Sequence, residues 1–83
     1  MIKVVAKHFI EESRINDFLE NAAELVESSL KEDGCISYGL YQDVKDSEVV
    51  AMIEEWEDRD SLEDHMASEH FKSIVPGLNE FYE

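Results

Sequence analysis

The chain has 83 residues, of which 21 are acidic and 7 are basic, so it carries a formal net charge of -14 at neutral pH. Its length predicts one domain spanning residues 1–83, and a content of 43% hydrophobic residues is typical of a folded globular chain. A strongly acidic surface repels phosphate backbones and anionic lipids, so we expect no nucleic-acid partner and no membrane partner.

The cysteine count and the hydropathy exclude further classes of protein. A single cysteine, Cys35, excludes a disulfide within the chain and a zinc site built on several thiolates. No apolar run approaches the roughly 20 residues that a membrane-spanning helix needs, and the first residues show no signal-peptide pattern. We therefore expect a cytoplasmic protein.

The first two predicted elements are a strand and a helix. Residues 2–10 are rich in β-branched residues and predict a strand whose even and odd positions form opposite faces. Apolar residues recur at steps of three and four between Ile15 and Leu30, which predicts an amphipathic helix with Ser13 as its N-cap. Gly34 supplies a left-handed residue that ends the helix.

Two strands and a helical segment follow. Residues 35–43 and 49–56 predict strands, and the short connection between them predicts an antiparallel hairpin. Asp60 begins a capping-box pattern that predicts a helix, and Ser68 has the features of a second cap. Pro76 is expected to kink or end the last helix.

The order of these elements predicts the fold class. Strand, helix, strand, strand, helix is an α+β, ferredoxin-like βαββα(β) arrangement, with an antiparallel sheet, helices on one face and a last strand that is missing or short. The first and third strands are apolar on both faces, so the uncovered face would expose an apolar patch that monomers rarely tolerate. We therefore predict a homodimer that forms through the open sheet faces.

The histidines are the main candidates for chemistry. His65 shares a helical stripe with Leu62 and Met66 and is expected to face the sheet, although a structural histidine bonded to a carboxylate or a carbonyl has the same pattern. On one continuous helix, His65 and His70 cannot face the same metal ion, and only a break at Ser68 would change this. The sequence therefore predicts no metal site.

Four further residues have both a functional and a structural interpretation. His8 lies on an otherwise apolar strand face, where a polar group needs a partner or a task, unless it lies near solvent at the strand end. Glu54 shares a largely apolar face with Trp56, whose default role is core packing. Tyr38 adds a phenol on the neighbouring strand.

Two stretches of the chain, EDGCISYGLYQD and VVAMIEEWEDRDSLEDHMASEHF, together resemble the antibiotic-biosynthesis monooxygenase family, and most of all its small quinol-monooxygenase-like members. The matching pattern is a Gly-Cys turn, an aromatic strand, a strand ending in Glu-x-Trp, then Leu-x-x-His and Ser-x-His-Phe. The resemblance implies a ferredoxin-like unit that dimerises into an α/β barrel. The family includes cofactor-free oxygenases, haem-degrading enzymes and an isomerase of a phosphorylated signalling sugar.

This chain departs from the family pattern in two places. The family usually has a fourth strand after the last helix, whereas this chain stops at Glu83, where that strand would begin, so the outer edge of the first strand would be open. Haem degradation is disfavoured, because Ala6 or Lys7 stands near the position of the asparagine that this activity uses, and Val75 near that of the histidine.

The resemblance implies a cofactor-independent monooxygenase that oxidises a small phenol or hydroquinone with dioxygen. No cofactor is expected, because no flavin, nicotinamide or phosphate-loop motif is present. His65 is the candidate base, and Trp56 and His70 complete the candidate catalytic set. The candidate substrate contacts are His8, Tyr38, Glu54, Met66 and Phe71. The alternatives are a non-catalytic dimeric module that binds a small ligand, and an isomerase of a small phosphosugar-like metabolite, which the scarcity of basic residues disfavours.

Overall fold

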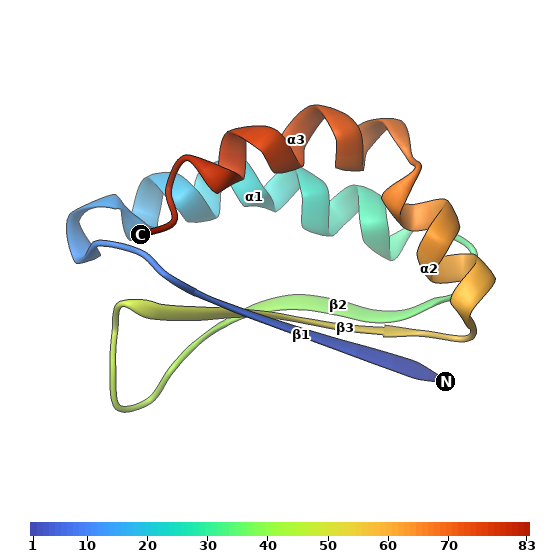
Figure 1. The fold of residues 1–83 in the computed structure, drawn as a ribbon, viewed down its shortest axis with the longest axis horizontal. Helices are drawn as coiled ribbons and strands as arrows, with labels where there is room; N and C mark the ends of the chain where they lie inside the picture. Colours follow the sequence, from blue (N-terminus) through green and yellow to red (C-terminus); the bar gives the residue numbers. More distant parts are fainter.

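The structure, a computed structural model that describes residues 1–83, contains an antiparallel sheet of three strands in the spatial order β1-β3-β2. Helices lie over one face of the sheet and leave the other face uncovered (Figure 1). The elements are β1 (Ile2–Phe9), a 3-10 turn (Glu12–Arg14), α1 (Ile15–Leu30), β2 (Cys35–Gln42), β3 (Val49–Trp56), α2 (Arg59–Met66) and α3 (Glu69–Asn79). The predicted ferredoxin-like α+β class is confirmed.

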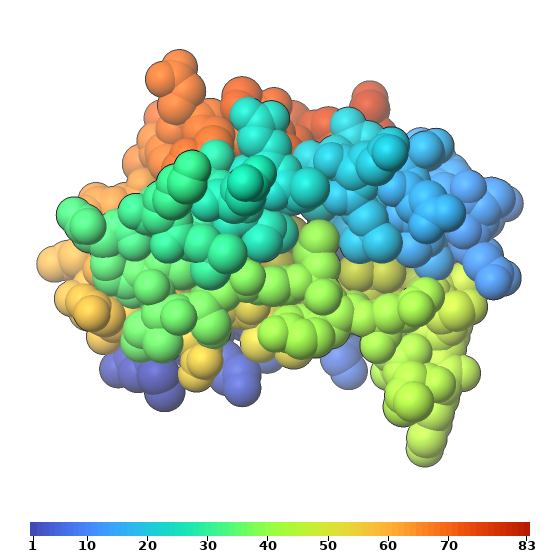
Figure 2. Space-filling model, turned by 180° about the vertical axis from the view of Figure 1, so that it is seen from behind, coloured from blue at the N-terminus to red at the C-terminus, as the bar shows by residue number.

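The strand β3 is central because it pairs with both of its neighbours. It lies antiparallel to β1 along the whole length of both strands. It pairs antiparallel with β2 through the predicted hairpin, with one irregularity between Cys35 and Ser37. The loop of the hairpin, residues 43–48, projects from the body of the molecule (Figure 2). This order leaves β1 and β2 as the two edges of the sheet.

The two faces of the sheet differ sharply in burial. Along β1 the even-numbered residues are partly buried toward the helices, and the odd-numbered residues are exposed. The core lies between the helix-covered face and α1 and α3, because this is where apolar faces of the elements meet. Its fully buried members, each less than 2% exposed, include Ile10, Phe18, Ala22, Leu25, Trp56 and Leu78.

The helix starts differ from two sequence predictions. A 3-10 turn precedes α1, and no side chain caps that helix, so Ser13 is not its N-cap. Asp58 caps α2 by accepting a hydrogen bond from the backbone N–H of Ser61 at 2.8 Å, whereas Asp60 lies in the first turn. The reason is local geometry: Asp58 leaves β3 in an extended conformation, which aims its carboxylate at the free N–H groups.

The last helix also corrects one expectation. Ser68 caps α3 as predicted, since its hydroxyl accepts from the backbone N–H of Phe71 at 3.3 Å. Pro76 does not end the helix, which continues to Asn79. A proline removes only one backbone donor, and the last turn is held in place by Leu78, which is 1% exposed in the core.

The chain after α3 folds back onto the outer edge of β1. The backbone N–H of Glu83 donates to the carbonyl of Phe9 at 2.9 Å. The guanidinium of Arg14 lies 4.5 Å from the ring centre of Phe81 and donates to the carbonyl of Glu80 at 3.2 Å. None of the helices is long and apolar enough to span a membrane.

Candidate functional site

The principal pocket lies between the helix-covered face of the sheet and the helices α2 and α3. Its volume is ≈ 290 Å³, and most of the residues that line it are hydrophobic. Ligand pockets for small molecules start at about 300 Å³, so the pocket has the size for a compact ligand such as a substituted aromatic ring. The polar residues on its wall include His8, Tyr38, Glu54 and His65.

His65 of α2 is the most deeply buried titratable side chain on this wall, at 1% exposed. Its Nδ1 lies 2.6 Å from Oε2 of Glu32, and its Nε2 has no hydrogen-bond partner. A carboxylate can only accept, so the network assigns the ring proton to Nδ1, which donates to Glu32. In the neutral ring, Nε2 is then an unprotonated acceptor.

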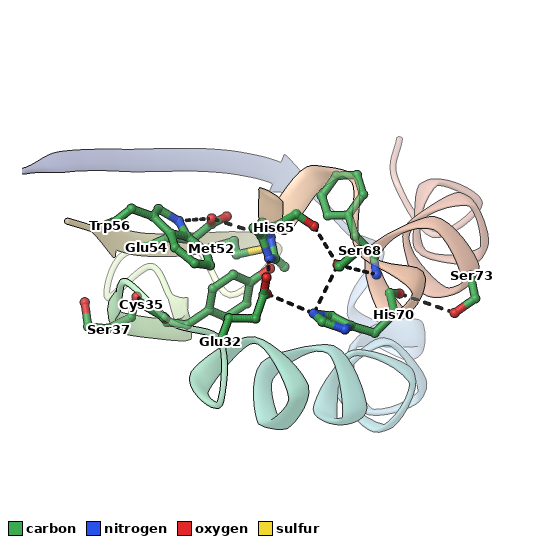
Figure 3. Close-up of polar contacts among 12 residues, drawn as sticks. Glu32, Cys35, Ser37, Met52, Glu54, Trp56, His65, Ser68, His70 and Ser73 are labelled. Carbon is green, nitrogen blue, oxygen red and sulfur yellow. Dashed lines mark hydrogen bonds and ion pairs between the residues drawn. The ribbon is translucent and has the colours of Figure 1, made fainter. Parts of the chain in front are cut away.

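Glu32 connects three segments of the chain. It follows α1, and its Oε2 lies 2.9 Å from Nε2 of His70 as well as 2.6 Å from His65 (Figure 3). The Ser68 hydroxyl donates to the carbonyl of His65 at 2.6 Å and lies 3.2 Å from Nε2 of His70. The two histidines can meet at one carboxylate because α2 ends at Met66 and α3 begins only at Glu69.

The sequence did not single out Glu32. It lies 33 residues before His65 and 38 residues before His70, so no helical or strand spacing relates the three. The nearest local signal is its place in the turn before Gly34, which predicts only a helix end. Its role depends on the packing of α1 against the other helices.

The same three residues are the ones that could hold a metal ion. The candidate ligand atoms of Glu32, His65 and His70 lie within 4.8 Å of one another, and two imidazoles with one carboxylate suit divalent transition metals. The break at Ser68 is the condition under which the sequence allowed both histidines to face one ion. These atoms are also joined by hydrogen bonds, so the cluster is satisfied as a structural network without an ion.

Glu54 is a buried carboxylate on the pocket wall, at 6% exposed. Its Oε1 accepts a hydrogen bond from Nε1 of Trp56 at 2.9 Å and lies 3.9 Å from Nε2 of His65. Trp56 is completely buried and packs on the His65 ring with centroids 4.5 Å apart, but it is not among the residues that line the pocket. It therefore supports Glu54 and His65 from behind the wall.

Two further ring residues of the wall, Tyr38 and His8, are both neutral at physiological pH. Burial, followed by the negative charge of Glu54, raises the pKa of Tyr38 far above its usual value, and its hydroxyl donates to Sδ of Met52 at 3.1 Å. Burial lowers the pKa of His8, whose ring stacks on Tyr82 with centroids 3.6 Å apart. Neither side chain brings a charge to the pocket.

The remaining candidates divide between the wall and its surroundings. Met66 and Phe71 line the pocket, and the Phe71 ring meets the His65 ring edge-on at 5.1 Å. His70 does not line the pocket, and hydrogen bonds through Glu32 and Ser68 connect it to His65, which does. A ligand in the pocket would thus meet His65 directly and His70 only through the hydrogen-bond network.

The fold and the site together define a class of small ferredoxin-like α+β proteins with a buried histidine beside an apolar pocket. A family model described as antibiotic biosynthesis monooxygenase matches residues 1–77. The chain belongs to this family, which confirms the resemblance seen in the sequence. The match covers all three strands and most of α3.

Similar solved structures and a similar curated protein agree with this assignment. A conserved protein from Methanosarcina mazei is 42% identical with a TM-score of 0.94, over 98% of this chain and 80% of that chain. A structure described as an antibiotic biosynthesis monooxygenase is 41% identical with a TM-score of 0.89, over 100% of this chain and 87% of that chain. The Bacillus subtilis protein named "Putative monooxygenase YcnE" is 29% identical, over 90% of this chain and 79% of its own length.

Proposed function

We propose that the protein is a cofactor-independent monooxygenase that oxidises a small phenol or hydroquinone with dioxygen, and that His65 is its base. The observation that carries this proposal is that Nε2 of His65, a residue that lines the apolar pocket, is buried without a hydrogen-bond partner. The opposite nitrogen is anchored to Glu32 at 2.6 Å, which holds the ring in one orientation and one tautomer. A base so arranged can take a proton from a substrate hydroxyl.

The reaction then proceeds on the substrate itself. Nε2 takes the hydroxyl proton, and the resulting anion passes one electron to dioxygen. The two radicals combine to form a carbon–oxygen bond, and the peroxide takes the proton back from His65. Loss of the ring C–H proton to Nε2 and cleavage of the O–O bond leave a carbonyl and water. The balance is one phenol and one dioxygen giving one quinone and one water.

Several features of the site support this chemistry over the alternatives. The positive charge that forms on His65 during proton transfer lies beside Glu32 and 3.9 Å from Glu54, so two carboxylates stabilise it. No lysine or arginine lines the pocket, so nothing there is suited to hold a phosphate group. This disfavours the isomerase of a phosphosugar.

The other candidate residues act around this base. Trp56 and His70 position it, Trp56 by ring packing and His70 through the shared carboxylate of Glu32. Tyr38, Met66 and Phe71 provide the apolar wall that excludes water from the anion. His8 and Glu54 are the polar groups that the substrate would contact in addition to His65.

The experiment is oxygen uptake with a panel of phenols and hydroquinones on chelator-treated protein. Wild-type protein should consume oxygen, and with ¹⁸O₂ it should place one labelled atom in the product and one in water. His65→Gln, which keeps the size of the side chain, should abolish this activity. The control Glu27→Gln removes an exposed carboxylate on α1 and should leave it unchanged. Uptake that survives His65→Gln would refute His65 as the base, and ligand binding without uptake would indicate a non-catalytic binding module.

We propose further that two copies of the chain form a homodimer through the uncovered face of the sheet. Apolar side chains on this face remain strongly exposed, with Val5 at 53%, Phe9 at 56% and Tyr41 at 55%. Pairing the two faces would remove this apolar area from water. Val5→Lys should dissociate the dimer in sedimentation experiments, whereas Val44→Lys, in the hairpin loop and 95% exposed, should not. A wild-type monomer at micromolar concentration would refute this assembly.

A further inference from the structure

Two residues of the pocket wall place hydrogen-bond acceptors close to each other. Nε2 of His65 and Oε1 of Glu54 are 3.9 Å apart, and both side chains line the pocket (Figure 3). Nε2 is an acceptor because Nδ1 carries the ring proton toward Glu32. A carboxylate offers about four lone-pair sites, and one donor, Nε1 of Trp56, occupies one site of Glu54.

The protein supplies no further donor to this pair of acceptors. Nε2 of His65 is buried without a partner. The nearby Tyr38 hydroxyl is directed to Sδ of Met52, and no lysine or arginine lines the pocket. Buried polar groups are normally paired, so a ligand that fits this wall must bring the missing donors itself.

We infer that the pocket binds 1,2-dihydroxyaromatic compounds, with one hydroxyl donating to Nε2 of His65 and its neighbour donating to the carboxylate of Glu54. This inference deepens the proposed function, because it names the substrate class of the same pocket. The ligand hydroxyl that donates to His65 is the one that loses its proton in the proposed reaction. The second hydroxyl fixes the orientation of the ring.

The geometry favours adjacent hydroxyls over other arrangements. Oxygens on neighbouring ring carbons lie roughly 2.8 Å apart, which lets each reach its own acceptor at ordinary hydrogen-bond length across a 3.9 Å gap. Hydroxyls at opposite ends of a ring point in opposite directions, so only one of them can reach this wall. A phenol with only one hydroxyl leaves one of the two acceptors unpaired, which costs roughly 10- to 100-fold in affinity.

Charge and size narrow the class further. A ligand with a carboxylate or sulfonate would bring a negative charge close to Glu54, with no cation in the pocket to offset it. The volume of ≈ 290 Å³ leaves room for a compact apolar substituent on the ring. The expected ligand is therefore an uncharged catechol with a small apolar substituent.

The test is calorimetric binding without oxygen, on metal-stripped protein, so that neither turnover nor chelation contributes. The probes are 4-methylcatechol, its 2-methyl ether, which loses one donor, and methylhydroquinone, which separates the two donors. We expect the catechol to bind roughly 10- to 100-fold more tightly than either. In Glu54→Gln the preference should fall to within about threefold, because the amide presents a donor to the ligand.

A matched variant controls for charge. Glu55 is the next residue on β3, and its carboxylate accepts from the Ser37 hydroxyl at 2.9 Å. Neighbouring residues of a strand face opposite sides of the sheet, so Glu55→Gln should leave the catechol preference unchanged. If Glu54→Gln does not fold, as judged by circular dichroism, the comparison of the three ligands on wild-type protein decides by itself.

The outcomes separate this inference from the proposed oxygenase. Equal binding of the catechol and its methyl ether to wild-type protein would overturn the ligand class, even if the protein consumed oxygen with hydroquinones. Preferential binding of the catechol without oxygen uptake would support the ligand class and refute the oxygenase. Binding of the catechol with uptake that depends on His65 would support both.

Discussion

Replacing Glu32 by glutamine should destabilise the protein, because this carboxylate joins the end of α1 to α2 and α3. Its Oε2 holds His65 at 2.6 Å and His70 at 2.9 Å, and its side chain is only 16% exposed. A hydrogen bond to a charged group contributes about 1.5–3 kcal/mol, and a neutral one about 0.5–1.5 kcal/mol. Glutamine keeps the shape but can satisfy both histidines only with neutral bonds.

Each of the two bonds is weakened by about 1–1.5 kcal/mol, so the expected loss is about 1–3 kcal/mol after allowing for partial exposure. In a domain of 60–100 residues this lowers Tm by roughly 4–24 °C. The assay is urea unfolding at fixed protein concentration, followed by the fluorescence of Trp56, the sole tryptophan. The control is Glu27→Gln, an exposed position on α1.

A double-mutant cycle separates the two bonds. The effects of Glu32→Gln and His70→Ala should not add, because the first weakens and the second removes the same contact. The reasoning would be refuted if Glu32→Gln stayed within about 0.5 kcal/mol of the Glu27→Gln control, which is the ordinary range of surface substitutions. The network would then be a geometric coincidence rather than a stabilising element.

Three further predictions concern the site and the residues that pack around it. Trp56→Phe should cost about 3–5 kcal/mol in the free energy of unfolding by chemical denaturation, because it leaves a cavity and removes the donor of the buried Glu54; the double variant with Glu54→Leu should recover part of this loss. Gly34→Ala should cost about 2–5 kcal/mol, since Gly34 has φ +82° and a Cβ there would lie 2.1 Å from Oγ of Ser61; Ser61→Gly should relieve the steric part of that cost in thermal unfolding. Burial lowers the pKa of His8 in the folded state, so the unfolded chain binds a proton there first. Stability should therefore fall as the pH drops below the unfolded value of about 6.5, and His8→Gln should make the decline measured between pH 7 and pH 5 less steep.

Local sequence patterns were sufficient to predict the strands and helices. The alternation of residues in β1 and the apolar spacing in α1 predicted both elements and their faces, because burial on one side imposes a period of two on a strand and of about 3.6 on a helix. The cap at Ser68 was equally local. Capping by Asp58 instead of Asp60 was missed, because both residues have the right chemistry and only the exit angle of β3 distinguishes them.

The site could be predicted only in part. His65 and Glu54 were singled out as polar residues on apolar faces, and the structure places both on the pocket wall. Trp56 was placed in the candidate catalytic set, but it lies behind Glu54 and His65, where its indole is fully buried. Which side of a packed group faces the cavity depends on neighbouring elements, and no spacing within one strand contains that information.

By itself, the sequence determined the order and type of the elements, the uncovered apolar face of the sheet and membership of the family. These follow from local periodicity and from short motifs that lie within one or two elements. Only the tertiary structure decided that Glu32 holds His65 and His70 together, and that Nε2 of His65 is left facing Glu54. The physical reason is that these contacts join residues more than 30 positions apart, or atoms on different elements, so they exist only once the helices have packed on the sheet.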